Sequence, residues 1–238
     1  MKHVTRAMAV FALVAGHGYA QVPKEIALGR QITAEFDAKH NMVTDAQVID
    51  FVQSVLKNLS RDEVLRLPLT LRVVEDSEAV ASALPGGTVL LSSGAILQAE
   101  NEAELAALLS HAMGHVQAGQ SSKSNPSTTG IPVIFMGGPW GYCVRVRNGR
   151  RWMLAQTDLF ETQADFLGLG YLTHAGYDPQ ALVSVFAHGE FSPRDEVKSM
   201  AVALTNASTV LNTSAFDEIR RRLTLPPTPR PAVPTLYK

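Results

Sequence analysis

The sequence predicts an α+β fold that is mostly helical, with a small β-sheet beside one central helix. Apolar residues recur at helical spacing from Asp45 to Leu59 and again from Asn101 to Gly119. Between these segments, Leu69 to Glu75 alternates as a half-buried strand does, and Thr88 to Ser92 forms a second strand. A chain of 238 residues is short enough for one hydrophobic core.

Composition narrows the class of protein. The chain is 46% hydrophobic and 18% charged, with 21 Lys and Arg against 22 Asp and Glu. This balance excludes a disordered chain and the basic footprint of a nucleic-acid-binding protein, so we expect no nucleic-acid partner. Cys143 is the only cysteine, which rules out an intramolecular disulfide and a cysteine-based metal site.

The first residues have the pattern of a secretion signal. Lys2 and Arg6 precede an apolar run from Ala7 to Ala15, and small residues lead to a cleavage site near Ala20. The alternative is a membrane anchor, but a spanning helix needs about 20 apolar residues and this run stops at 16–18. We expect cleavage, export to the periplasm or the exterior, and no membrane span in the mature protein.

The remaining elements are expected in the following order. A helix at Pro23–Lys39 precedes the helix that Asp45 caps, and the two strands follow, the second after the turn Leu84–Gly87. The central helix opens with Asn101 as N-cap and Glu104 three residues later.

After the central helix, residues 120–150 are rich in Ser, Asn, Pro and Gly, which indicates a loop. Such a long connection is typical of a lid or a substrate-facing excursion, and a short strand packed on the core is the equally good alternative. A helix at Asp158–Ala175 follows, and Asp178 with Pro179 begins another. The expected organisation is a signal peptide (1–20), one domain (21–225) and a Pro-rich extended tail (226–238).

Four residues on two helices suggest a metal site. His111 and His115 lie four residues apart, so both imidazoles project from one helix face and can bind one ion. Glu161 and Asp165 have the same spacing on the later helix. Hydrolytic zinc sites commonly use two His and one Glu, and a ligating His needs a partner on its other ring nitrogen. Alternatively, the histidines are core residues and the carboxylates form a solvated face.

An ordered series of motifs gives this pattern a family resemblance. The series consists of Ala83–Gly87, Ser93–Gly94, Asn101–Leu105, His111–His115 and Glu161–Asp165. It resembles the HtpX-like and CAAX-prenyl-protease family of zinc metallopeptidases, family forty-eight of the gluzincin type, and especially its soluble periplasmic members.

The resemblance implies a zincin-like metallopeptidase domain with one Zn²⁺ per chain. It places the metal ligands at His111, His115 and Glu161, and it gives Asp165 the role of supporting aspartate. It also implies a polypeptide substrate or protein partner. We expect an extended peptide to pair with a sheet edge at Thr88, Val89, Leu90, Leu91 and Ser92.

One departure from the family pattern concerns catalysis directly. Members read His-Glu-x-x-His, whereas this chain has Ala112 after His111, so the general base is missing. Loss of a positioned base typically lowers the rate by about 10²–10⁴. Ala112 is not a ligand, so the prediction of metal binding is unaffected.

Two further positions are candidate contacts to the metal or to the oxyanion. Some relatives carry a His and an Arg near the zinc at the spacing of His188 and Arg194, and exposed surface positions are the alternative.

Three functions follow from these observations. The first is a zinc metalloendopeptidase of the cell envelope whose hydrolysis is weak or absent. The second is a zinc-binding pseudopeptidase that holds peptides or a partner as a chaperone-like module. The third, the least favoured, is an active peptidase that uses another carboxylate such as Glu190 as its base.

Overall fold

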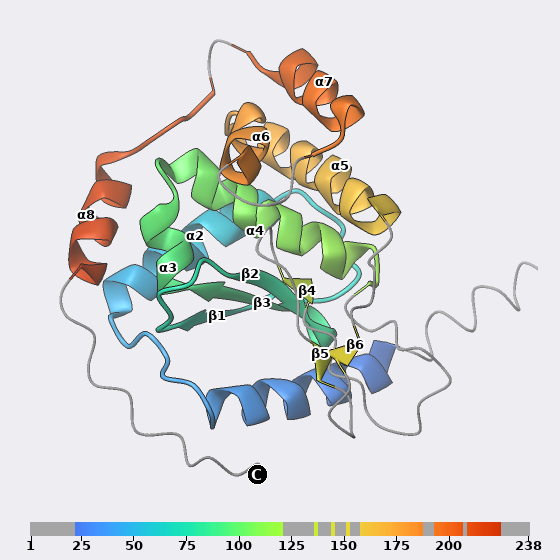
Figure 1. Cartoon of the computed structure of the whole chain (residues 1–238), viewed down its shortest axis with the longest axis vertical. Helices are drawn as coiled ribbons and strands as arrows, with labels where there is room; N and C mark the ends of the chain where they lie inside the picture. The colour runs from blue at the N-terminus through green and yellow to red at the C-terminus, as the bar shows by residue number, and fades with distance from the viewer. Residues whose placement is uncertain are drawn as a thin grey trace, which may run out of the picture.

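The computed structural model describes residues 22–120, 136–137, 144–145, 151–152, 158–187, 193–206 and 209–224. It is an α+β fold in which helices enclose a small sheet (Figure 1), and this confirms the predicted class. The signal peptide and the tail expected at 1–20 and 226–238 lie outside the described residues. So does most of the expected loop at 120–150, whose described parts are Gln120 and two residue pairs.

Within the described residues, two helices precede the sheet. The first spans residues 22–37, and α2 spans Ala46–Ser60. The carboxylate of Asp45 accepts hydrogen bonds from the backbone N–H groups of Gln47 and Val48, which satisfies donors that an uncapped helix leaves unpaired. One face of α2 is buried in the core, through Val48, Val52, Val55, Leu56 and Leu59.

In the part of the chain that the structure describes, the main sheet has four strands in the order β1-β3-β2-β4. They are β1 (Thr70–Val74), β2 (Ala81–Leu84), β3 (Thr88–Ser92) and the short β4 (Met136–Gly137). β3 runs parallel to β1 and antiparallel to β2. Because β3 is paired on both sides, the prediction that Thr88–Ser92 is a sheet edge open to a peptide is wrong.

The turn between β2 and β3 depends on two glycines. Residues Pro85–Gly87 form a 3₁₀ turn, in which Gly86 and Gly87 have φ values of 82° and 90°. A side chain is strained in this left-handed region. A β-carbon on Gly87 would also lie 2.3 Å from the carbonyl oxygen of Pro68. The Leu84–Gly87 turn expected from the sequence is therefore present, and it reverses the chain into β3.

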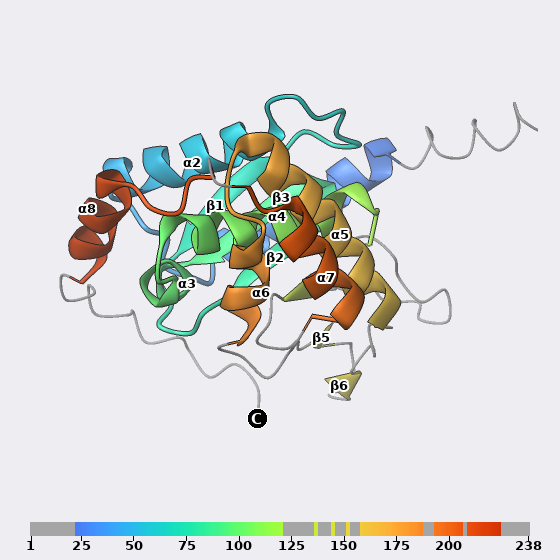
Figure 2. The ribbon, with the colours of Figure 1, turned by 90° about the horizontal axis from the view of Figure 1, so that it is seen from above.

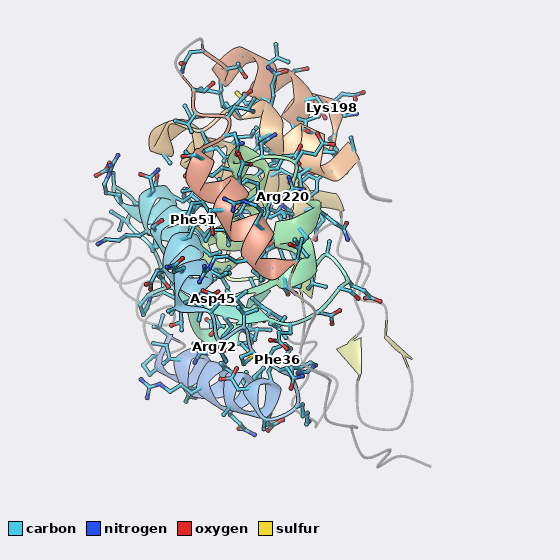
Figure 3. The ribbon with its side chains drawn as sticks, turned by 90° about the vertical axis from the view of Figure 1, so that its left-hand side faces the viewer. Phe36, Asp45, Phe51, Arg72, Lys198 and Arg220 are labelled. Carbon is cyan, nitrogen blue, oxygen red and sulfur yellow. The ribbon has the colours of Figure 1, made fainter. Side chains whose placement is uncertain are left out.

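Both faces of the sheet are covered. On one face, Val74 and Leu90 pack against Phe36 of the first helix, and the hydroxyls of Thr33 and Thr88 are hydrogen-bonded at 3.2 Å. The guanidinium of Arg72 pairs with Asp37 at 3.1 Å, and Figure 3 shows Arg72 and Phe36 where this helix meets the sheet. The other face belongs to the main core.

Six helices follow β3 among the described residues. They are α3 (Ser93–Gln98), α4 (Glu102–Gln117), α5 (Asp158–Ala175), α6 (Gln180–Ala187), α7 (Asp195–Leu204) and α8 (Ser214–Leu223). α4 packs against β2 and β3 on one side and against α5 and α6 on the other (Figure 2). Every residue from Glu102 to Val116 is buried, so α4 is the central element of the core.

Two smaller features complete the architecture. Strands β5 (Val144–Arg145) and β6 (Arg151–Trp152) pair as a two-stranded ribbon.

Arg66 joins the first helix to the end of α4, because its guanidinium pairs with the buried carboxylate of Glu25 at 2.6 Å and donates to the carbonyl of Val116 at 3.4 Å. Among the described helices, none has the length and apolar character needed to cross a membrane.

Candidate metal centre

Helix α4 holds both predicted histidine ligands in the interior. Its start is fixed by Asn101, whose side-chain oxygen accepts from the backbone N–H of Glu104 at 3.0 Å. His111 and His115 follow on adjacent turns, with exposed fractions of 3% and 1%. The two imidazoles are therefore presented from one helix face in the buried interior.

Close backbone contact places α5 beside these histidines. A β-carbon on Gly114 would lie 2.5 Å from the carbonyl oxygen of Ala164, and one on Gly168 would lie 3.3 Å from the backbone nitrogen of His111. Only glycine permits so close an approach at Gly114. The crossing brings Glu161 and Asp165, both buried, next to the two imidazoles.

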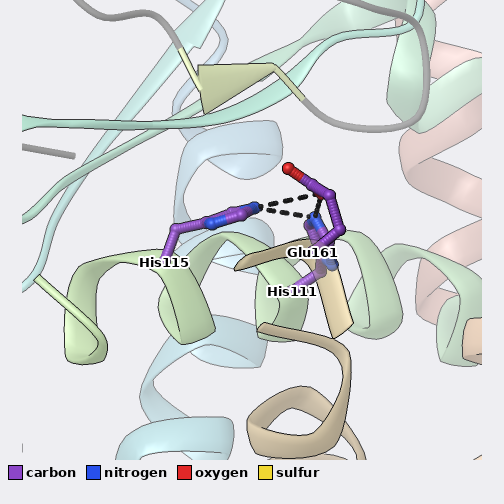
Figure 4. A group of neighbouring side chains, drawn as sticks. All are labelled: His111, His115 and Glu161. Atoms are coloured by element: carbon purple, nitrogen blue, oxygen red, sulfur yellow. Dashed lines mark hydrogen bonds and ion pairs between the residues drawn. The ribbon is translucent and has the colours of Figure 1, made fainter. Parts of the chain in front are cut away.

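The three predicted ligand atoms converge on one point. Nε2 of His111 and Nε2 of His115 lie 3.0 Å apart, and Oε2 of Glu161 lies 3.3 Å from the first and 3.5 Å from the second (Figure 4). Ligand atoms at about 2.0–2.1 Å from a tetrahedral zinc are separated by about 3.3 Å. The triangle therefore has the size of one face of a zinc tetrahedron.

The protonation pattern of the histidines also favours a cation. His111 Nδ1 lies 2.9 Å from Oδ1 of Asp165, and His115 Nδ1 lies 2.6 Å from the side-chain oxygen of Gln120. Each Nδ1 is thus a hydrogen-bond donor. When both rings are neutral, the Nε2 atom of each ring therefore carries a lone pair that faces the Nε2 atom of the other ring. Oε1 of Glu161 is buried without a hydrogen-bond partner among the described residues. A divalent ion between these atoms would satisfy all three residues.

The contacts between the imidazoles and the carboxylates also shift the pKa values of His111 and Glu161. Burial lowers the pKa of His111, but hydrogen bonds and charge attraction from Asp165 and Glu161 outweigh burial and raise this pKa to about 9. Burial raises the pKa of Glu161, and the two histidines outweigh it and lower the pKa to about 2. The buried carboxylates therefore favour positive charge on the imidazole side of the cluster.

Ala112 lies between the two histidines on α4. It follows His111 directly, is 1% exposed and belongs to the main core. Its methyl group cannot accept a proton, so the helix turn that carries the ligands offers no base at this position. The ring of Phe186 from α6 packs edge-on against His111, with centroids 5.0 Å apart, and helps to enclose this side of the cluster.

The other candidate residues have different outcomes. His188 and Glu190 lie outside the described residues. Arg194 is exposed and immediately precedes α7, and its contact with a metal or an oxyanion stays a prediction.

Sequence reasoning did not identify Gln120 as a partner of His115. The available signal was a polar side chain directly after the glycine that ends α4.

Comparison with known proteins agrees with this geometry. The sequence pattern described as Peptidase family M48 matches residues 43–220, which include all three ligand positions. The beta-barrel assembly-enhancing protease of Escherichia coli strain K12 is 23% identical over 177 residues, which cover 68% of this chain and 36% of that protein. The corresponding protease of Yersinia pestis gives the same values.

A eukaryotic protein is similar over nearly the same region. The mitochondrial metalloendopeptidase OMA1 of Schizosaccharomyces pombe is 26% identical over 164 residues, which cover 66% of this chain and 49% of that protein. The chain therefore spans between about a third and a half of the length of these relatives.

Proposed function

The chain belongs to peptidase family M48, and we propose that it binds one Zn²⁺ through His111, His115 and Glu161 in an exported, metalloendopeptidase-like domain of weak hydrolytic power. The observation that carries this proposal is the triangle of ligand atoms, with edges of 3.0, 3.3 and 3.5 Å. Asp165 orients His111 in this assignment. The bound zinc would polarise a substrate carbonyl and lower the pKa of its water to about 7.

Weak hydrolysis follows from Ala112. In the family pattern a glutamate at this position takes the proton of the attacking water, and a methyl group cannot. The other residues of the site would hold and enclose the metal, and neither role removes a proton from water. Removal of a positioned base lowers the rate by about 10²–10⁴, so proteolysis should be slow or undetectable.

A pseudopeptidase is the second candidate, and the same position favours it. A domain that keeps its ligand triangle while lacking the base can still hold an extended peptide or a partner protein. The relatives are named as a protease that enhances β-barrel assembly and as a mitochondrial metalloendopeptidase, and this chain matches less than half of the length of each, so these names do not identify a substrate here.

The decisive experiment restores the base. Purified protein is analysed for zinc and assayed with casein as the parent, as Ala112→Glu and as Ala112→Gln. Glutamine matches glutamate in size but cannot take a proton, so it separates the base from the extra volume. We expect about one zinc per chain in all three proteins and faster cleavage only in Ala112→Glu, by about 10²–10⁴.

Two results would count against this proposal. An Ala112→Glu protein that is folded and zinc-loaded but cleaves casein no faster than the parent would favour the pseudopeptidase. Folded protein without zinc would reduce the site to a structural remnant.

Export is proposed from the N-terminal pattern. A positively charged start, an apolar run and small residues up to Ala20 are the features that a signal peptidase reads. Mass measurement of the protein recovered from the envelope fraction should give a chain that begins near residue 21. An unprocessed chain in the cytoplasm would contradict export without affecting the metal site.

A further inference from the structure

The side chain of Gln120 is buried beside the metal ligands although the residue lies beyond the end of α4. Its exposed fraction is 1%. Gly119, with φ at 66°, turns the chain back, and the backbone N–H of Gln120 donates to the carbonyl of His115 at 3.1 Å. This six-residue closure is the Schellman ending of a helix. It returns the Gln120 side chain to the turn that carries His115.

The hydrogen bonds of Gln120 determine which nitrogen of His115 holds the proton. Nε2 of Gln120 donates to the side-chain oxygen of Gln163 at 3.0 Å, so the Gln120 oxygen faces His115. An amide oxygen only accepts, so Nδ1 of neutral His115 must be the donor. The lone pair is therefore on Nε2, which faces His111 and Glu161.

The two histidines are thus held by different chemistry. His111 donates to the carboxylate of Asp165, whereas His115 donates to a neutral amide that a second amide orients. The second amide belongs to α5, two residues after Glu161, so the bridge also joins the end of α4 to the helix that supplies the third ligand.

We propose that Gln120, oriented by Gln163, is a positioning residue that sets the tautomer and ring direction of His115 for metal binding. This inference rests on the zinc site proposed above. Outer partners of metal-bound histidines typically contribute a factor of about 10–100 in metal affinity. Gln120 supplies none of the three proposed ligand atoms, so its direct effect on a bound metal would pass through its hydrogen bond to His115.

Zinc affinity, measured by competition with a chromophoric chelator, tests the proposal. Gln120→Leu keeps the approximate volume but removes the acceptor, and it should weaken zinc binding by about 10–100-fold. Gln120→Glu restores an acceptor and should keep or tighten the affinity. Gln163→Ala removes only the outer amide and should have a smaller effect. In the cobalt-substituted protein, Gln120→Leu should also change the visible absorption spectrum, because the ring direction of one ligand changes.

The matched control is Gln117→Leu, on the last turn of the same helix. The oxygen of Gln117 accepts from the backbone N–H of Arg66 at 2.8 Å, so this change costs stability without touching His115. Its zinc affinity should equal that of the parent. Nitrogen NMR of the metal-free proteins gives a second readout, in which His115 should be a single Nδ1–H tautomer in the parent and a mixture in Gln120→Leu.

The outcomes separate the two proposals. If the parent binds zinc and Gln120→Leu binds it equally well with an unchanged His115 tautomer, the positioning role is overturned and the zinc site stands. If the parent binds no zinc, both proposals fail. Should Gln120→Leu not fold, Gln120→Asn replaces it, because the shorter amide cannot reach His115 with the same geometry and should also weaken binding.

Discussion

A β-carbon placed on Gly114 would lie 2.5 Å from the carbonyl oxygen of Ala164, so α4 and α5 meet backbone to backbone beside the candidate metal ligands. The contact lies one residue before His115 and one residue before Asp165 in their respective helices. The separation of the helices at this point therefore sets the distance between the imidazoles and the carboxylates.

The Gly114→Ala variant should lower both stability and zinc content. The added methyl group must push α5 away, and such overpacking typically costs about 1–3 kcal/mol. Urea unfolding measures the free energy, and metal analysis measures the zinc. Gly170→Ala is the control on α5, because an added β-carbon there meets nothing within 4 Å. Its stability should stay equal or rise, and a Gly114→Ala protein that matched it would contradict the close-contact argument.

Zinc should stabilise the folded protein through His111. A ligand at 100 times its dissociation constant adds about 2.7 kcal/mol to the stability of the state that binds it. Thermal unfolding with and without zinc should show this increase in the parent and lose it in His111→Ala. His174→Ala is the control, since His174 is exposed and pairs with Glu63 at 2.8 Å. An equal zinc response in both variants would remove His111 from the ligand set.

Tyr177→Phe should destabilise the start of α4. The tyrosine hydroxyl donates to the buried carboxylate of Glu102 at 2.8 Å, and Thr213 donates to the other oxygen of this carboxylate. Loss of one donor leaves a buried carboxyl oxygen short of a hydrogen-bond partner, which costs about 1–3 kcal/mol. Tyr171→Phe deletes the same atom from a buried tyrosine outside this cluster and should cost less. Equal losses in urea unfolding would count against the Glu102 cluster.

Asp45 links the start of α2 to α8. Its carboxylate caps α2 and pairs with Arg222 at 3.0 Å, and Figure 3 shows Asp45 at the head of the helix. Asp45→Asn keeps an acceptor for the cap but loses the ion pair, whereas Asp45→Ala loses both. Stability should therefore fall in the order parent, Asn, Ala.

The pH dependence of this link follows from the carboxylate. Partial burial would raise the pKa of Asp45, but Arg222 and the backbone N–H groups of Gln47 and Val48 outweigh it and hold the pKa below the ordinary 3.8. The stabilisation is thus fully present above pH 3.8 and is lost as the pH falls below it. Unfolding curves measured in acid should converge for the parent and Asp45→Asn. A constant gap at every pH would exclude the ion pair as its source.

Sequence reasoning could predict the cluster of candidate metal ligands because helical spacing is local. His111 and His115 share a face by periodicity alone, and the same is true of Glu161 and Asp165. The close packing of α4 against α5 depends on Gly114. The sequence does not predict this role, because the contact partner, Ala164, is distant along the chain. Gln120 was missed for a related reason: its direction depends on the left-handed conformation of Gly119.

The error about the sheet has a physical origin too. All four residues of β2, Ala81–Leu84, are buried, so the segment lacks the alternation that marks a half-buried strand. Without β2, Thr88–Ser92 looked like an edge. In the structure β1 and β2 both pair with it, and a peptide would need another place to bind.

The complete burial of α4 has a consequence for chain cleavage. A helix with no solvent-facing side is poorly soluble alone, and its partners α5 and α6 come from the other side of residues 121–157. If a protease cuts the backbone between α4 and α5, neither fragment should survive as a folded body. The two pieces should instead co-purify as a non-covalent pair, and after separation in denaturant they should regain structure only when mixed.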